Sequence, residues 1–214
     1  MSQLRITEIF HSLQGEARTI GRPTVFVRLT GCPLRCQYCD TEYAFSGGSL
    51  QSRETILQQV AAYQPRLVTV TGGEPLAQPG CWDLVAALCD AGYEVSIETS
   101  GAMDIQGLDP RAIVVLDLKT PDSGEQHRNL LGNIEHLRWQ DQIKFVICSR
   151  RDYQWARLQL DDLKLAERVS DVLFSPSYGQ IDARELADWV VDDRLPVRFQ
   201  LQLHKLLWSD EPGR

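Results

Sequence analysis

The chain has 214 residues, of which 43% are hydrophobic and 24% are charged, and this composition is that of an ordinary globular protein rather than a fibrous or disordered one. Its 22 Lys and Arg residues against 29 Asp and Glu residues give a formal net charge of -7, and the basic residues are scattered. A broad surface for nucleic acid is therefore not expected. Because no Pro/Gly/Ser-rich linker interrupts the sequence, we expect residues 1–214 to form a single domain.

The first ten residues differ from a secretory signal, which has a basic start and a long apolar stretch. The longest apolar runs, such as residues 113–116, are far shorter than the roughly 20 residues that cross a bilayer. We therefore expect a cytoplasmic protein that does not contact membranes. Three of the six cysteines lie between positions 32 and 39, where disulfide bonds among them are sterically poor, so we expect reduced thiols that bind a metal centre.

In chain order, short runs rich in β-branched residues alternate with longer amphipathic stretches, which predicts repeated βα units. The expected strands are 24–30, 67–71, 94–99, 113–119, 142–148, 172–174 and 197–203, and the expected helices are 52–63, 80–91, 129–137, 150–166 and 182–193. Such units form a parallel sheet with right-handed crossovers, and a full eight-unit barrel takes about 250 residues. We therefore predict an α/β fold in the form of an incomplete βα barrel.

Two expected strands carry polar side chains on the face turned away from the helices. In the strand at 24–30, Arg28 lies opposite the apolar face formed by Val25, Val27 and Leu29. The strand at 197–203 and the residue after it have a polar column of Arg198, Gln200, Gln202 and His204. This pattern indicates either an edge strand that faces solvent or a polar barrel lumen that holds a ligand.

A cysteine motif follows the first expected strand, on the side where βα barrels place their active sites. Cys32, Cys36 and Cys39 have the spacing C-x3-C-x2-C. Three thiolates on a tight loop bind either structural zinc or an iron-sulfur cluster, and structural zinc needs a fourth ligand that no neighbouring Cys or His supplies. A [4Fe-4S] cluster held by three cysteines has one iron with an open coordination position, which is the mark of a reactive centre.

This loop, with Tyr38 directly before the last cysteine, resembles the cluster loop of the radical S-adenosylmethionine (SAM) superfamily. The resemblance implies a full or partial βα barrel, a [4Fe-4S] cluster, an external electron donor, and SAM bound to the open iron by its amino and carboxylate groups. The sequence Gly72-Gly73-Glu74-Pro75 is similar to the GGEP motif of that superfamily. Independently, two glycines let a ligand approach the backbone closely, and Glu74 can accept a hydrogen bond from an ammonium group.

Further motifs resemble those of one family in this superfamily, the 7-carboxy-7-deazaguanine synthases. They are Ser12-Leu13-Gln14-Gly15-Glu16, Arg28, Cys39-Asp40-Thr41 and His204-Lys205. The resemblance implies a lyase of the deazapurine pathway that leads to queuosine, converting 6-carboxy-5,6,7,8-tetrahydropterin to 7-carboxy-7-deazaguanine with loss of ammonia. It also implies Mg2+ as a second cofactor and a homodimer.

The same resemblance implies roles for individual residues. Cys32, Cys36 and Cys39 are expected to hold the cluster, and Thr41 is expected to provide a hydroxyl ligand for Mg2+. The residues expected to contact SAM are Tyr38, Gly73, Glu74, Lys119, Ser175, Pro176, Ser177 and Tyr178. The residues expected to contact the pterin are Leu13, Gln14, Gly15, Arg28, Thr71 and His204. Arg28 suits such a site, because a guanidinium in a barrel lumen needs an anion and the substrate carries a carboxylate.

One departure from the family pattern is Ala17, which stands where many relatives have a second glycine and indicates a less permissive backbone. Two other functions also fit parts of the sequence. A glycyl-radical-enzyme activase resembles this chain in size, cysteine loop and GGEP motif, but acts on a large protein and has no need of Gln14, Glu16 or Arg28. A non-catalytic iron-sulfur or zinc-binding module has no need of a barrel-sized chain with a polar lumen.

Overall fold

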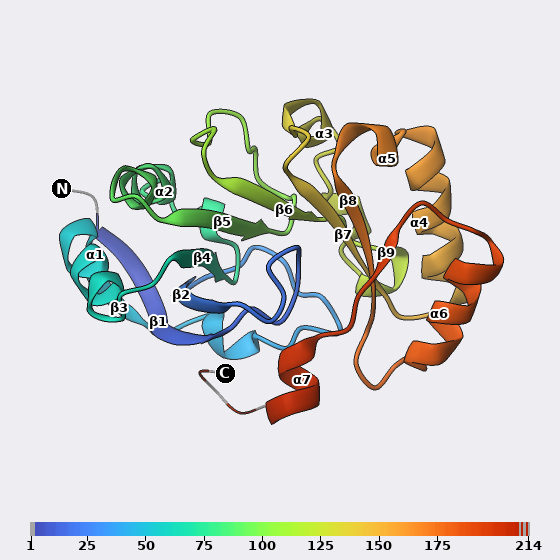
Figure 1. Cartoon of the computed structure of the whole chain (residues 1–214), viewed down its shortest axis with the longest axis horizontal. Coiled ribbons are helices and arrows are strands. Elements are labelled where there is room, and N and C mark those ends of the chain that lie inside the picture. The colour runs from blue at the N-terminus through green and yellow to red at the C-terminus, as the bar shows by residue number, and fades with distance from the viewer. Residues whose placement is uncertain (1–2, 210, 212, 214) are drawn as a thin grey trace.

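The computed structural model describes residues 3–209, 211 and 213, which contain a nine-stranded sheet in the order β3-β1-β2-β4-β5-β6-β7-β8-β9 (Figure 1). From β2 to β9 all neighbouring strands are parallel, whereas β1 pairs antiparallel with both β2 and β3. The strands are β1 (Gln3–Leu13), β2 (Pro23–Leu29), β3 (Ser49–Ser52), β4 (Leu67–Gly72), β5 (Glu94–Thr99), β6 (Ile113–Asp117), β7 (Gln142–Ile147), β8 (Asp171–Pro176) and β9 (Arg198–Phe199).

Helices alternate with the parallel strands and lie along the outside of the curved sheet, except α7, which follows the last strand and begins beside the β1–β2 loop (Figure 1). They are α1 (Arg53–Ala62), α2 (Cys81–Asp90), α3 (Asn133–His136), α4 (Arg150–Asp162), α5 (Leu165–Arg168), α6 (Ala183–Asp192) and α7 (Leu203–Trp208), with 3-10 helices η1 (Glu42–Ala44), η2 (Pro75–Ala77), η3 (Pro121–Ser123) and η4 (Gln126–Arg128). In the described part of the chain, none of these helices combines the length and apolar character needed to cross a membrane.

The predicted alternation of strands and helices is confirmed, and its hydrophobic core lies between the sheet and the helices. Val25, Val27 and Leu29 of β2 are completely buried in this core, as the expected apolar face of the first strand requires. Phe26 and Arg28 point to the other side of β2 and line a cavity. The polar face of this strand is therefore a lumen and not a solvent-exposed edge.

Some expected helices are shorter than the sequence indicates. The expected helix at 129–137 is reduced to α3, and the expected helix at 150–166 is divided into α4 and α5. The division occurs at Lys164, which has a left-handed backbone with φ of 50° that an α-helix does not accommodate. Amphipathic spacing continues across such a break, so periodicity alone does not reveal it.

The prediction for residues 197–203 is wrong after Phe199. Only Arg198 and Phe199 pair with β8, and the chain then leaves the sheet and forms α7 from Leu203. The backbone N–H of Leu203 donates to the carbonyl oxygen of Gly15 at 3.0 Å, so this segment crosses to the loop between β1 and β2. Alternating polarity predicted a strand here, but the contact with Gly15 directs the chain away from the sheet.

Two strands, β1 and β3, were not expected from the sequence. They extend the parallel sheet at its β2 edge, where Leu4 and Ile6 of β1 are buried in the core. The loop from β1 to β2 covers the amino ends of β7 and β8: the backbone N–H of Arg18 donates to Gln142 Oε1 at 2.8 Å, and Arg18 Nε donates to Asp171 Oδ2 at 3.1 Å. This loop therefore closes one end of the incomplete barrel.

Ala17 lies in this closing loop with φ of 62° and is almost completely buried. A left-handed backbone costs a residue with a Cβ atom about 1–2 kcal/mol, and glycine avoids this cost while adding about 0.5–1 kcal/mol of unfolded-state entropy. We expect Ala17→Gly to raise the free energy of unfolding by about 0.5–1 kcal/mol, measured by urea denaturation. Ala86→Gly, within the right-handed helix α2, is the control and should lower it by about 1 kcal/mol. Equal destabilisation by both substitutions would contradict the strain at Ala17.

Candidate active site

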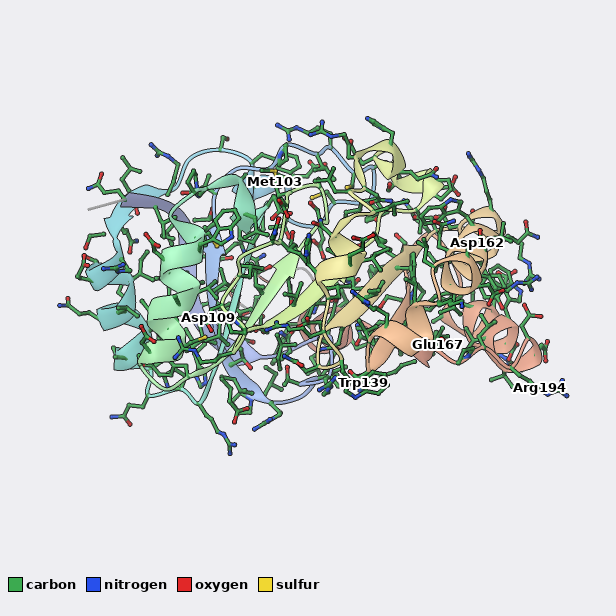
Figure 2. The ribbon with its side chains drawn as sticks, turned by 90° about the horizontal axis from the view of Figure 1, so that it is seen from above. Met103, Asp109, Trp139, Asp162, Glu167 and Arg194 are labelled. Carbon is green, nitrogen blue, oxygen red and sulfur yellow. The ribbon has the colours of Figure 1, made fainter. Side chains whose placement is uncertain are left out.

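A cavity of about 510 Å³ lies at the carboxyl ends of the parallel strands. Its lining comes from the loop after β2, from the ends of β4, β5, β6 and β7, and from the segments 13–16, 177–180 and 202–205. Figure 2 distinguishes the carboxyl ends of the strands from their amino ends. Met103, which follows β5, lies on the opposite side from Asp109 and Trp139, which precede β6 and β7. Because its lining comes from the carboxyl ends of the strands, the cavity lies where βα barrels carry their active sites.

The three cysteines of the motif all line this cavity and are partly exposed to it. Their loop is held by backbone hydrogen bonds from Gly31 N to Ala44 O at 2.7 Å and from Glu74 N to Gly31 O at 2.8 Å. Within the described ranges, no three or more His, Cys, Asp or Glu side chains close on a single metal ion. The other cysteines, Cys81, Cys89 and Cys148, are buried, as expected of small hydrophobic residues.

The surroundings of the three thiols act on their thiolate forms in two opposite directions. Burial raises the pKa of each thiol, that of Cys36 to about 11. Against this, the backbone N–H groups of Leu34 and Thr41 stabilise the thiolates of Cys32 and Cys39, and the positive charge of Lys119 acts on all three. Soft thiolate ligands on one loop are the donor set of an iron-sulfur cluster.

Gly73 is required where the cysteine loop crosses the end of β4. A Cβ atom at this position would lie 2.3 Å from the carbonyl oxygen of Gly31 and 2.8 Å from Cβ of Cys32. Both distances are shorter than real Cβ contacts, so any other residue would push the cysteine loop away. The glycines were predicted to let a ligand approach the backbone closely. In this structure Gly73 lets the cysteine loop approach the backbone closely.

The surroundings of Glu74 differ from the contact with SAM that the GGEP motif indicates. Its carboxylate is completely buried, does not line the cavity, and accepts hydrogen bonds from Leu76 N, Thr99 Oγ1, Ser100 N and Ser100 Oγ at 2.5–3.0 Å. Burial raises the pKa of this carboxyl, and the hydrogen bonds oppose that shift. In this structure Glu74 joins the end of β4 to the end of β5, and its contact with SAM stays a prediction.

Tyr38 and Lys119 meet at the cluster end of the cavity. Lys119 Nζ lies 5.7 Å from the centre of the Tyr38 ring and 2.9 Å from Asp117 Oδ2. The other carboxylate oxygen of Asp117, and the hydroxyl of Tyr38, are buried and have no hydrogen-bond partner among the residues that the structure describes. A buried polar atom without a partner is costly, so these two atoms fit a ligand with hydrogen-bonding groups of its own.

The floor of the cavity is a network of charged and polar side chains. Gln14 Nε2 donates to Thr69 Oγ1 at 3.1 Å and to Glu98 Oε1 at 3.3 Å, and Thr71 Oγ1 donates to Glu98 Oε2 at 3.0 Å. Burial and the neighbouring negative charge of Glu16 raise the pKa of the Glu98 carboxyl. This floor presents several hydrogen-bond donors and acceptors to a small polar ligand.

A second part of the floor joins the β1–β2 loop to the C-terminal segment. Glu16 accepts from Lys144 Nζ and from Gln202 Nε2, the latter at 2.7 Å. His204 lies against Gly15, where an added Cβ atom would come within 2.2 Å of His204 Nδ1. Burial lowers the pKa of His204, which favours the neutral imidazole. Gly15 and His204, far apart in the sequence, thus form one wall.

Arg28 projects from β2 into the same cavity. Its Nε donates to Glu8 Oε1 at 2.7 Å, and its guanidinium lies 5.6 Å from the ring centre of Phe10 and 5.8 Å from that of Tyr43. The side chain keeps only 15% of its accessible surface. A partly buried cation with one carboxylate partner can accept a second anion from a ligand.

The structure brings most predicted site residues together. The cavity is lined by Leu13, Gln14, Gly15, Arg28, Cys32, Cys36, Tyr38, Cys39, Thr41, Thr71, Gly73, Lys119, Ser177, Tyr178 and His204. Ser175 and Pro176, like Glu74, lie behind the lining: both are buried in β8, and Ser175 Oγ accepts a hydrogen bond from Gln200 at 3.4 Å. Their contact with SAM was implied by the family resemblance and stays a prediction.

Several lining residues had no assigned role in the sequence analysis, notably Glu98 and Lys144. Charged residues within the β-branched strands at 94–99 and 142–147 were the available signal, because a charge in such a strand must face a lumen or solvent. The choice between these two surroundings depends on how the sheet curves, which the sequence does not show.

Comparison with known proteins agrees with this geometry. A model of the radical SAM superfamily matches residues 26–136. The 7-carboxy-7-deazaguanine synthase of Chlorobaculum tepidum is 41% identical over 97% of this chain and 96% of its own length, and that of Koribacter versatilis is 40% identical over 97% and 98%. The crystal structure of QueE from Escherichia coli superposes with a TM-score of 0.75 and 25% identity, covering 94% of this chain and 95% of the other.

The partial barrel and its cysteine-lined cavity are those of a radical SAM enzyme, a class whose members use a [4Fe-4S] cluster and SAM. Within that superfamily, the chain belongs to the 7-carboxy-7-deazaguanine synthase family. The predicted fold and the predicted family are both confirmed.

The cluster ligands are tested by replacing cysteines one at a time. We expect Cys32→Ala, Cys36→Ala and Cys39→Ala each to abolish reductive SAM cleavage, because two thiolates cannot hold the cluster correctly. Cys81→Ala and Cys89→Ala, which alter buried thiols of α2, should retain iron, sulfide and SAM cleavage. The measurements are iron and sulfide analysis and SAM cleavage after anaerobic reconstitution. Loss of iron in the α2 variants with retention in the others would reverse the assignment.

Proposed function

We propose that this chain converts 6-carboxy-5,6,7,8-tetrahydropterin to 7-carboxy-7-deazaguanine with loss of ammonia, as a radical SAM lyase of queuosine and deazapurine biosynthesis. The single observation that carries the proposal is one cavity with two chemically different ends. The cysteine loop forms one end, and Gln14, Arg28, Thr71 and His204 gather at the other. The names of the full-length relatives agree with this use of the cavity.

At the first end, the three cysteines would hold the cluster, which when bound supplies the electron for reductive cleavage of SAM. Asp117 Oδ1 and the Tyr38 hydroxyl are available as partners for polar groups of SAM. Lys119 holds Asp117 in place through its other oxygen, at 2.9 Å, and packs over the Tyr38 ring. These contacts orient the ligand and protect it from water.

At the second end, Arg28 faces the cavity with a guanidinium suited to the carboxylate of the substrate. Gln14, Thr71 and Glu98 offer donors and acceptors for the polar edge of a pterin ring, which carries both kinds of group. Because this end is covered by the 14–16 segment and by His204, it suits a small molecule better than the loop of a large protein. This favours the lyase over a glycyl-radical activase.

The proposal is tested by incubating the anaerobically reconstituted wild-type enzyme with a chemical reductant, SAM and the carboxytetrahydropterin. Formation of 7-carboxy-7-deazaguanine, identified by mass spectrometry, with one 5'-deoxyadenosine or less per product is the expected result. SAM cleavage without this product, together with radical formation on a glycyl-radical enzyme, would support the activase instead. Zinc without iron in the purified protein would support the non-catalytic module.

Mg2+ is proposed to act through Thr41 and the substrate. Thr41 lines the cavity, and its Oγ1 donates to Asp40 Oδ1 at 2.8 Å, which directs the lone pairs of the hydroxyl away from Asp40. Mg2+ prefers oxygen ligands in octahedral geometry and commonly binds one or two protein groups together with substrate oxygens and water. A homodimer and a cytoplasmic location also remain predictions from the sequence.

This metal role predicts a specific effect of Thr41→Val, which keeps the shape of the side chain and removes its oxygen. Turnover should fall and lose most of its response to added Mg2+, while iron content and uncoupled SAM cleavage stay near those of the wild type. Since a single hydroxyl binds Mg2+ weakly, metal affinity in the wild type should rise when the substrate is present, and substrate affinity should rise by the same factor. Identical Mg2+ activation curves for the two proteins would remove Thr41 from the metal site.

A further inference from the structure

Glu8 holds Arg28 in a defined position inside the cavity. Within the described residues, the side chain of Arg28 makes one hydrogen bond, from its Nε to Glu8 Oε1 at 2.7 Å. The guanidinium therefore keeps the fork of Nη1 and Nη2 for another acceptor. Because a bidentate contact with a carboxylate needs two parallel N–H groups, this end of Arg28 is suited to an anionic ligand.

An irregularity in β1 places Glu8 where it can do this. Ile6 pairs with Leu29 of β2, and the next pair is Glu8 with Arg28, so Thr7 is an extra residue in β1. In regular pairing Thr7 would stand opposite Arg28, and Glu8 would face the buried Val27. Directly opposed residues of an antiparallel pair share a face, and bulges beside active sites commonly redirect one side chain. Here the redirected side chain is the partner of the cavity arginine.

Tyr43 links the same oxygen of Glu8 to the cysteine loop. The Tyr43 hydroxyl donates to Glu8 Oε1 at 2.8 Å, and its ring also lies over the guanidinium of Arg28. Tyr43 belongs to η1, which begins directly after Thr41. Contacts thus run from Tyr43, two residues after Thr41, through Glu8 to Arg28. They connect the segment that carries Thr41 with the cavity arginine.

Without Glu8, a second carboxylate would compete for Arg28. Glu98 lies at the floor of the same cavity, and the positive charge of Arg28 is one of the influences that lower the pKa of Glu98 against the effect of burial. An arginine side chain has four rotatable bonds, so a released guanidinium would turn toward this half-buried anion. Glu8 therefore gives Arg28 a carboxylate partner other than Glu98.

We infer that Glu8, assisted by Tyr43, is a positioning residue that directs the Nη1/Nη2 fork of Arg28 at the carboxylate of the substrate. This inference rests on the proposed function, because it requires a carboxylated substrate in this cavity. It assigns a specificity role to two residues that do not themselves bind the substrate. Recognition of the carboxylate then depends on Glu8, whereas recognition of the pterin ring does not.

The test compares Glu8→Ala with Glu8→Gln, for two ligands. The ligands are the carboxytetrahydropterin, as substrate, and a tetrahydropterin without the 6-carboxyl group, as competitive inhibitor. Loss of a hydrogen bond to a charged group corresponds to roughly a ten-fold or greater change, so Glu8→Ala should raise the KM for the substrate by about ten-fold or more. Its kcat, its uncoupled SAM cleavage and its affinity for the carboxyl-free inhibitor should change by less than about three-fold.

Glu8→Gln retains Oε1, the oxygen that accepts from both Arg28 and Tyr43, and should restore the KM to within about three-fold of the wild type. Tyr43→Phe, which removes a hydroxyl from an exposed side chain, should raise the KM about two- to five-fold and is informative even if Glu8→Ala folds poorly. Glu94→Ala is the control for loss of a Glu–Arg pair, because its contacts with Arg66 at 2.7 Å and Arg22 at 3.8 Å lie at the opposite end of the strands. It should leave the KM unchanged.

An unchanged KM in Glu8→Ala, or an equal loss of affinity for both ligands, would overturn the inference. Turnover by the wild-type enzyme would still uphold the proposed function. Failure of Glu8→Gln to improve on Glu8→Ala would also overturn the inference, since the shared oxygen would then have no positioning role. Absence of turnover in the wild-type enzyme would instead overturn the proposed function, and the inference with it.

Discussion

The backbone contact between Gly31 and Gly73 determines where the cysteine loop lies, because it leaves no room for a side chain between the loop and the end of β4. The buried carboxylate of Glu74 extends this junction to β5 through its bonds with Thr99 and Ser100. A buried carboxylate is costly without donors around it, so these hydrogen bonds stabilise Glu74 at the junction. The cysteines are thereby positioned by the ends of three strands and not by their own loop alone.

The site is closed by two segments that a regular barrel would not need. The sheet is open, with edge strands β3 and β9. The loop at 14–22 and the segment at 200–205 meet through the hydrogen bond from Leu203 to Gly15. Arg18 fixes the first of these segments to the amino ends of β7 and β8. The incomplete barrel is therefore sealed by loops, and these loops bring polar side chains into the lumen. The segments that seal the barrel therefore also line the cavity.

Several cations in this lumen are paired with protein carboxylates. Lys144 is paired with Glu16, Lys119 with Asp117, and Arg28 with Glu8, so these three cations of the lining each have a protein carboxylate beside them. Paired charges avoid most of the cost of desolvation, and they hold each other in place. The Arg28 fork, Asp117 Oδ1 and the Tyr38 hydroxyl have no hydrogen-bond partner among the described residues and add to the polar groups of the floor. Such a set favours selectivity over general attraction of anions.

Much of this was determined by the sequence alone, because it depends on local spacing. The alternation of strands and helices, the apolar face of β2 and the cysteine loop at its end follow from residues close together in the chain. The Gln-Gly-Glu and Cys-Asp-Thr motifs also identified residues that line the cavity, Gln14 and Thr41 among them. A short motif is read without knowledge of the fold, since its residues stay neighbours in any conformation.

Only the tertiary structure decided the rest, because it depends on pairs of residues far apart in the chain. The early end of β9 follows from the contact of Leu203 with Gly15, and the inward position of Glu98 follows from the curvature of the sheet. Glu74, which the motif indicates as a ligand contact, is occupied by groups from β5 that only the folded chain brings to it. The pairing of Glu8 with Arg28 likewise depends on one extra residue in β1, and strand register cannot be counted until both strands are in place.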